Sequence, residues 1–177
     1  MKRTIIARLA VPFAALLLAT GCESGGVAIS GVTGSFVDSF SIAGQVILPG
    51  ATNAHIGSNS TTYSTDSFSG SRIVQIVFNA KFTGVTSSAQ VGSDDYLHDV
   101  FSAIAKGATL TAGGQTIDRL YGFWPKKASK NSATQATLFY LVPANTKASD
   151  LQWTMDGTVL GDATYQYTFT DFSETAE

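Results

Sequence analysis

Few residues in this chain could carry acid–base, nucleophilic or metal chemistry. It has one cysteine, Cys22, and two histidines, His55 and His98. Three acids stand beside His98: Asp94, Asp95 and Asp99. Carboxylates beside an imidazole can relay protons or ligate a metal ion. A tight metal site, however, usually draws ligands from a second structural element. We therefore interpret this set as the solvated N-terminal face of a helix, and predict no catalytic residues, no metal site and no cofactor.

The motifs that mark common enzyme sites do not occur in the sequence. There is no Gly-x-Ser-x-Gly nucleophile elbow, no Gly-x-Gly-x-x-Gly or Gly-Lys-Ser/Thr phosphate loop, and no calcium loop of alternating acids. This pattern favours a protein that is not an enzyme. A Ser-His-Asp triad assembled in space from this serine-rich chain stays open, and with it the least favoured function, hydrolysis of the cell envelope.

Aromatic side chains offer a second kind of site. Tyr121, Phe123 and Trp124 cluster in the segment LYGFWPKK, just before Pro125 and two lysines. Exposed rings with a cationic rim are typical of a protein-binding patch, so these three residues form our candidate binding patch. The alternative is a strand end whose rings cover the core.

The first 21 residues, MKRTIIARLAVPFAALLLATG, have the layout of a secretory signal peptide. Three basic residues accompany an apolar stretch from Leu9 to Leu18, which is shorter than the ~20 residues of a membrane span. The segment LATGC, which ends at Cys22, resembles the lipobox of bacterial lipoproteins, with Ala19 where that family prefers Leu. The resemblance implies cleavage before Cys22 and a diacylglycerol group on its sulfur, which would anchor the chain to a membrane.

Composition limits the class of the mature protein. Removal of the signal peptide leaves 156 of the 177 residues, the size of one domain. Three of the 11 Lys and Arg are lost with it, so eight remain against 13 Asp and Glu, a net charge of −5. Apart from Lys126, Lys127 and Lys130 there is no basic cluster, so we predict no nucleic-acid partner.

Alternating apolar and polar residues predict several strands. The clearest segment is 71–82, in which Val74, Ile76, Phe78 and Ala80 share one face. We predict that this strand lies in the middle of a sheet.

Other runs extend the same pattern. Residues 151–155 and 163–169 also alternate, whereas residues 137–142 are apolar on both faces, which indicates cover on both sides. The pair Gly113-Gly114 predicts a hairpin turn between the strands that flank it.

One segment, at about residues 94–106, has helical spacing. Its apolar residues Leu97, Val100, Phe101 and Ile104 recur at i, i+3, i+4 and i+7. Seven to nine short strands with one short helix predict an all-β fold, specifically an immunoglobulin-like β-sandwich, with the helix over an end or edge of a sheet.

Two segments carry a family resemblance. The long strand SRIVQIVFNAKFTGV is followed later by ATLFYLVPANTKASDLQW, an apolar strand that ends at Val-Pro before a polar turn and another strand. This order resembles the immunoglobulin-like domain of actinobacterial secreted lipoproteins, the family of the mycobacterial immunoprotective extracellular antigen. The resemblance spans residues 42–172 and implies the sandwich fold, with no catalytic residues to transfer.

These inferences divide the chain into a signal peptide (1–21), a lipidated flexible tether (22–31), a β-sandwich domain (32–173) and a tail (174–177). We expect the protein at the extracytoplasmic face of the cell membrane, held there by lipid on Cys22. The predicted function is that of a non-catalytic binding module for a protein or an envelope polymer. The alternative is a prophage- or plasmid-encoded surface-exclusion lipoprotein that blocks phage DNA entry or conjugation.

Overall fold

The computed structural model describes residues 26–42, 45–47, 54–56, 61–83, 101, 103–124, 132–157 and 166–175. Four subjects of the sequence analysis lie outside these residues: the signal peptide, Cys22, the acidic set around His98 and the three clustered lysines.

The described chain is mainly β-structure, which confirms the all-β class. Three strands are long: β1 (Gly26–Val37), β6 (Ser71–Thr83) and β10 (Ala133–Pro143). The shorter strands are β2 (Ser39–Ile42), β3 (Gln45–Ile47), β4 (Ala54–Ile56), β5 (Thr61–Ser64), β7 (Ala108–Ala112), β8 (Gln115–Ile117), β9 (Arg119–Trp124), β11 (Leu151–Asp156), β12 (Gln166–Phe169) and β13 (Phe172–Ser173). Two 3-10 turns, η1 (Thr65–Ser67) and η2 (Ala148–Asp150), precede bends or strands.

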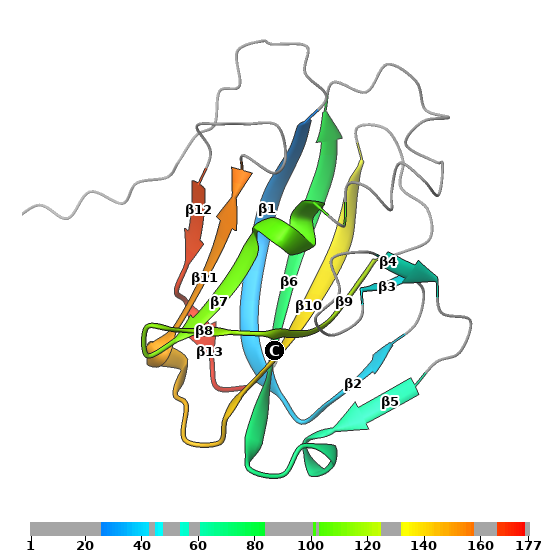
Figure 1. Ribbon diagram of the computed structural model, residues 1–177. Coiled ribbons are helices and arrows are strands. Elements are labelled where there is room, and N and C mark those ends of the chain that lie inside the picture. The colour runs from blue at the N-terminus through cyan, green and yellow to red at the C-terminus, as the bar shows by residue number, and fades with distance from the viewer. Residues whose placement is uncertain are drawn as a thin grey trace, which may run out of the picture.

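These strands form two facing sheets and a small ribbon (Figure 1). The large sheet has the order β13-β1-β6-β10-β9-β3-β4, and the small sheet has the order β12-β11-β7-β8. The ribbon is the antiparallel pair β2 and β5. Strands β6 and β10 lie inside the large sheet, as the sequence pattern of residues 71–82 predicts for β6.

The main core lies between the two sheets. On β6 the predicted apolar face is confirmed, because Val74, Ile76, Phe78 and Ala80 are all fully buried. From the small sheet, β11 contributes Trp153, whose ring centroid is 5.6 Å from that of Phe78. Alternation with period two thus turns one side of each strand towards the opposite sheet.

Strand β10 is covered on both faces, as its continuous apolar run predicts. Leu138 and Tyr140 belong to the main core. Phe139 points to the other face, where it joins a second hydrophobic cluster beneath the β2–β5 ribbon. This outer cover explains why residues 138–142 of β10 are apolar on both faces.

The predicted hairpin at Gly113-Gly114 is confirmed, with β7 paired to β8. The two glycines have φ of 56° and 81°, the positive values that a two-residue hairpin turn of this kind requires. The return strand, however, is divided in two at Asp118. Before it, β8 belongs to the small sheet, and after it, β9 belongs to the large sheet, so this segment links the two layers.

A short helix lies at residues 101 and 103–107, and the rest of the predicted helix falls outside the described residues. Phe101 and Ile104 are buried in the main core, as their spacing predicts. The Arg119 guanidinium donates a hydrogen bond of 2.8 Å to the carbonyl of Ala105, near the helix C-terminus. A cation at this end satisfies a carbonyl that the helix itself leaves open.

The predicted tether is too long, because the structure places residues 26–31 in β1. This strand pairs with β6 from Gly26 opposite Thr83 onwards. Ile29 is only 5% exposed and packs in the main core. Burial of that side chain and the ladder to β6 stabilise a strand at residues 26–31, where a flexible tether was predicted. Between Cys22 and β1 there remain three residues, Glu23, Ser24 and Gly25.

Candidate functional site

The structure brings two residues of the candidate patch together on the outer face of the large sheet. Tyr121 and Phe123 lie on β9 and are half-buried. For Trp124 the structure describes the backbone, which is paired with Gln45 of β3. The two rings belong to what we name the outer aromatic cluster, whose members are Phe40, Tyr63, Phe68, Tyr121, Phe123 and Phe139.

Ring stacking attaches the β2–β5 ribbon to the sheet through this cluster. Phe40 of β2 stacks on Phe139 of β10, with centroids 4.0 Å apart and planes 18° apart. On the other side of Phe40 lies Tyr63 of β5, at 5.3 Å. Phe123 stacks on Phe139 at 5.7 Å. Tyr121 thus packs against Phe40 and Tyr63 of the ribbon, and Phe123 packs beside Phe139, on the side of the sheet opposite the main core.

A pair of tyrosines lies at the margin of the outer aromatic cluster. The Tyr121 hydroxyl donates a hydrogen bond of 3.1 Å to the Tyr63 hydroxyl. Burial first, and then this bond and the nearby Tyr63 phenol, raise the pKa of Tyr121 to about 12. Because the pKa is raised from its ordinary value of 10.0, the stabilisation from the neutral pair is complete below pH 10. It is lost as the pH rises through about 12.

We expect Tyr63→Phe to lower the pKa of Tyr121 from about 12 towards 10, since the bond to the neutral phenol is removed and only burial remains. Carbon NMR of labelled tyrosine rings during an alkaline titration measures the change. Tyr167 is the internal control, because burial alone raises its pKa. If the pKa of Tyr121 does not move in Tyr63→Phe, the hydrogen bond has no part in the shift.

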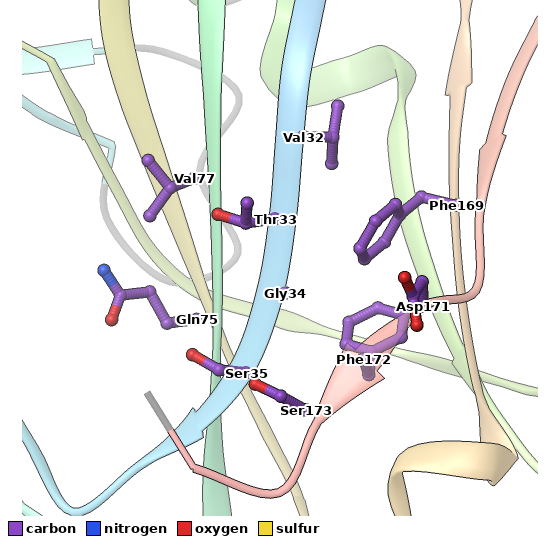
Figure 2. Close-up of a pocket in the computed structure, with 10 residues that line it drawn as sticks. All are labelled: Val32, Thr33, Gly34, Ser35, Gln75, Val77, Phe169, Asp171, Phe172 and Ser173. Atoms are coloured by element: carbon purple, nitrogen blue, oxygen red, sulfur yellow. The ribbon is translucent and has the colours of Figure 1, made fainter. Parts of the chain in front are cut away.

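A second site, which the sequence analysis missed, is a cleft at the edge of the large sheet. It has a volume of about 400 Å³. We name it the edge cleft, and its lining residues are Val32, Thr33, Gly34, Ser35, Gln75, Val77, Phe169, Asp171, Phe172 and Ser173. They come from β1, β6, β13 and the end of β12, and Figure 2 shows them on both sides of β1.

The cleft opens where β13 separates from β1. These strands are parallel and match at two positions, Gly34 with Phe172 and Ser35 with Ser173. On the N-terminal side of Gly34, a bulge between Ser30 and Thr33 shifts the register of β1 against β6. Gly31 has a φ of 58° there, which few residues other than glycine adopt. The edge of β1 is therefore bent beside the cleft.

Two aromatic rings form one wall of the edge cleft by packing on a glycine. Phe169 and Phe172 meet edge to face, with centroids 5.0 Å apart and planes 66° apart (Figure 2). A Cβ added to Gly34 would lie 2.5 Å from the Phe172 ring and 2.8 Å from the Phe169 ring. Glycine is thus required at this position for both rings to approach β1 closely.

A polar clip holds the chain just after β13. The Glu174 carboxylate is 2.9 Å from the Arg72 guanidinium of β6 and accepts a bond of 2.9 Å from the Ala148 N–H. Arg72 also donates to the Thr146 carbonyl at 2.8 Å. The pKa of Glu174 is lowered mainly by the hydrogen bond from the Ala148 N–H and, to a smaller extent, by the hydrogen bond from Arg72. The first residue of the predicted tail is therefore fixed to the domain, and it steadies the β13 wall of the cleft.

The cleft offers hydrogen-bonding groups rather than a reactive centre. Thr33, Ser35 and Ser173 supply hydroxyls, Gln75 supplies an amide and Asp171 a carboxylate. The described residues of its lining include no histidine, lysine or cysteine beside these hydroxyls. In the sequence, the segment FTDFS at 169–173 was the available signal, since it sets two aromatic rings around an acid at a strand end.

Two other kinds of feature are absent from the described ranges. No group of three or more His, Cys, Asp or Glu residues in them could hold a metal ion. No helix among the same residues is both long and apolar enough to cross a membrane. Comparison of the chain with protein-family models, with curated proteins and with solved structures gave no match.

Proposed function

We propose that this protein is a lipid-anchored, non-catalytic binding module at the extracytoplasmic face of the cell membrane. The lipobox-like segment before Cys22 supports the anchor. Its folded part is proposed to be an immunoglobulin-like β-sandwich. Two facing sheets of mainly antiparallel strands and the fully buried Trp153 between them support that assignment.

The observation that carries the binding function is the edge cleft. Thr33, Ser35 and Gln75 lie on paired strands of the large sheet, so these polar groups are held in place before a ligand arrives. Within the described part of the chain, the side chains of Thr33, Ser35, Gln75 and Asp171 make no hydrogen bond to protein. These groups are thus available to a ligand in a concave site, whereas the outer aromatic cluster uses its rings to hold the ribbon.

The position of the cleft along β1 suits a partner beyond the membrane surface. Strand β1 begins four residues after Cys22, a distance that an extended chain spans in at most ~14 Å. The cleft residues of β1 follow six to nine residues later, or about 20–30 Å along the strand. We propose that β1 runs away from the membrane, which places the site clear of the lipid headgroups.

Photo-crosslinking in intact cells tests this proposal. A photoreactive amino acid at Thr33, in the cleft, should give a covalent product with an envelope component. The same amino acid at Gln152, an exposed position on β11 of the small sheet, is the matched control and should not give that product. Identical products at both positions, or none at Thr33, would contradict a binding function for the cleft.

A further inference from the structure

We propose that the edge cleft binds a neutral saccharide unit of an envelope glycan. This inference rests on the proposed function and names the ligand class of its site. The volume of about 400 Å³ lies within the ~300–1,000 Å³ of small-molecule sites, towards the end that suits one or two sugar rings.

The polar lining matches the hydrogen bonding of sugar hydroxyls. Every sugar hydroxyl both donates and accepts, and so do the hydroxyls of Thr33 and Ser35 and the amide of Gln75. The Ser173 hydroxyl already donates to the Thr175 carbonyl at 2.6 Å, which leaves it free to accept. The Asp171 carboxylate accepts charge-assisted bonds, which are the stronger kind.

The apolar lining matches the other side of a sugar, the flat face of ring C–H groups. Phe169 is half-exposed at the cleft, while Phe172 behind it is 8% exposed and holds its orientation. An aromatic ring of this kind gives a ligand a rigid apolar surface. Val32 and Val77 add aliphatic contacts on either side of β1.

Charge and backbone shape argue against other ligand classes. None of the described residues that line the cleft is basic, so these residues offer an anionic ligand no counter-charge. The one acid, Asp171, is exposed, and an exposed charge attracts a cation only weakly because water and salt screen it. The bulge between Ser30 and Thr33 interrupts the edge of β1, which disfavours the addition of a peptide strand.

The test uses the mature lipidated chain in micelles of a sugar-free polyoxyethylene detergent. Saturation-transfer NMR with maltose, cellobiose and N,N′-diacetylchitobiose as probes should show binding of at least one of these neutral disaccharides. Asp171→Asn, which removes the charge on one hydrogen-bond acceptor, and Gln75→Ala, which removes the side-chain amide, should each weaken it about tenfold. Asp66→Asn and Gln152→Ala, at exposed positions away from the cleft, are the matched controls and should bind like the parent.

Three results would overturn the inference. The first is that no neutral probe binds at millimolar concentration. The second is that Asp171→Asn and Gln75→Ala leave the binding unchanged. The third is a preference for cationic glucosamine that is abolished by salt. Membrane partition and the Thr33 crosslink report on the proposed function separately. A protein that stays anchored and crosslinks at Thr33, yet binds no neutral sugar, would retain its proposed function with a ligand of another class.

Discussion

Cys22→Ser should abolish incorporation of a labelled fatty acid and the membrane retention that depends on it. A serine hydroxyl does not replace the thiol that a lipobox-like segment presents for alkylation. Each buried CH₂ of a lipid chain contributes ~0.8 kcal/mol, so loss of two acyl chains removes the anchor altogether. Metabolic labelling, cell fractionation and the intact mass of the product measure the effect. The variant should be unlabelled, and either released or left with its signal peptide.

The control for this experiment moves the thiol without changing the composition of the segment. Cys22→Ser combined with Ser24→Cys keeps one cysteine, two places further along the chain. If the lipobox sets the site of modification, the double variant should also stay unlabelled. Labelling that persists in Cys22→Ser itself would show that lipid is attached elsewhere, and the proposed anchor would be wrong.

Trp153→Ala should lower the free energy of unfolding by about 3–5 kcal/mol, the usual cost of truncating a large core aromatic residue. Trp153 is completely buried between the sheets, in contact with Phe78 and with Tyr167, whose ring centroid is 6.2 Å away. Its indole N–H also donates to the buried Tyr140 hydroxyl at 3.2 Å. Urea unfolding of the purified chain measures the change as a lower midpoint.

Two further variants separate packing from hydrogen bonding at this position. Trp153→Phe keeps most of the ring volume but leaves the Tyr140 hydroxyl without its donor, so a loss of about 1–3 kcal/mol is expected. Gln152→Ala, the exposed neighbour on β11, should stay within about 0.5 kcal/mol of the parent. An equally small loss in Trp153→Ala would mean that β11 does not pack against the large sheet.

The pattern of apolar and polar residues predicts the strands whose faces are covered by other parts of the domain. The strict alternation of Val74, Ile76 and Phe78 is visible in the sequence because one face of β6 is buried against the opposite sheet from Val74 to Ala80. The continuous apolar run of β10 is equally visible, since both of its faces are covered. In these segments, local pattern and tertiary environment agree, which is what makes them predictable.

Features created by distant residues were not predictable in the same way. Phe40 and Phe139 stack on each other although 99 positions separate them, so no local pattern reports that the β2–β5 ribbon covers the sheet. The edge cleft depends on the parallel match of Gly34 with Phe172, near opposite ends of the folded chain. The flexible tether predicted for residues 22–31 extends too far, because composition does not record the ladder between β1 and β6.

The early start of β1 has a mechanical consequence. In the proposed orientation, the membrane pulls on β1 at Gly26, and a ligand in the edge cleft pulls on the same strand at Thr33 to Ser35. Tension between cell and envelope would then run along one strand, and the rest of the domain would bear little of it. Because both forces act on β1, its covalent backbone would carry the tension, and the hydrogen bonds to β6, which lie across that direction, would be little loaded. The module would then act as a stiff connection between the membrane and the bound envelope ligand.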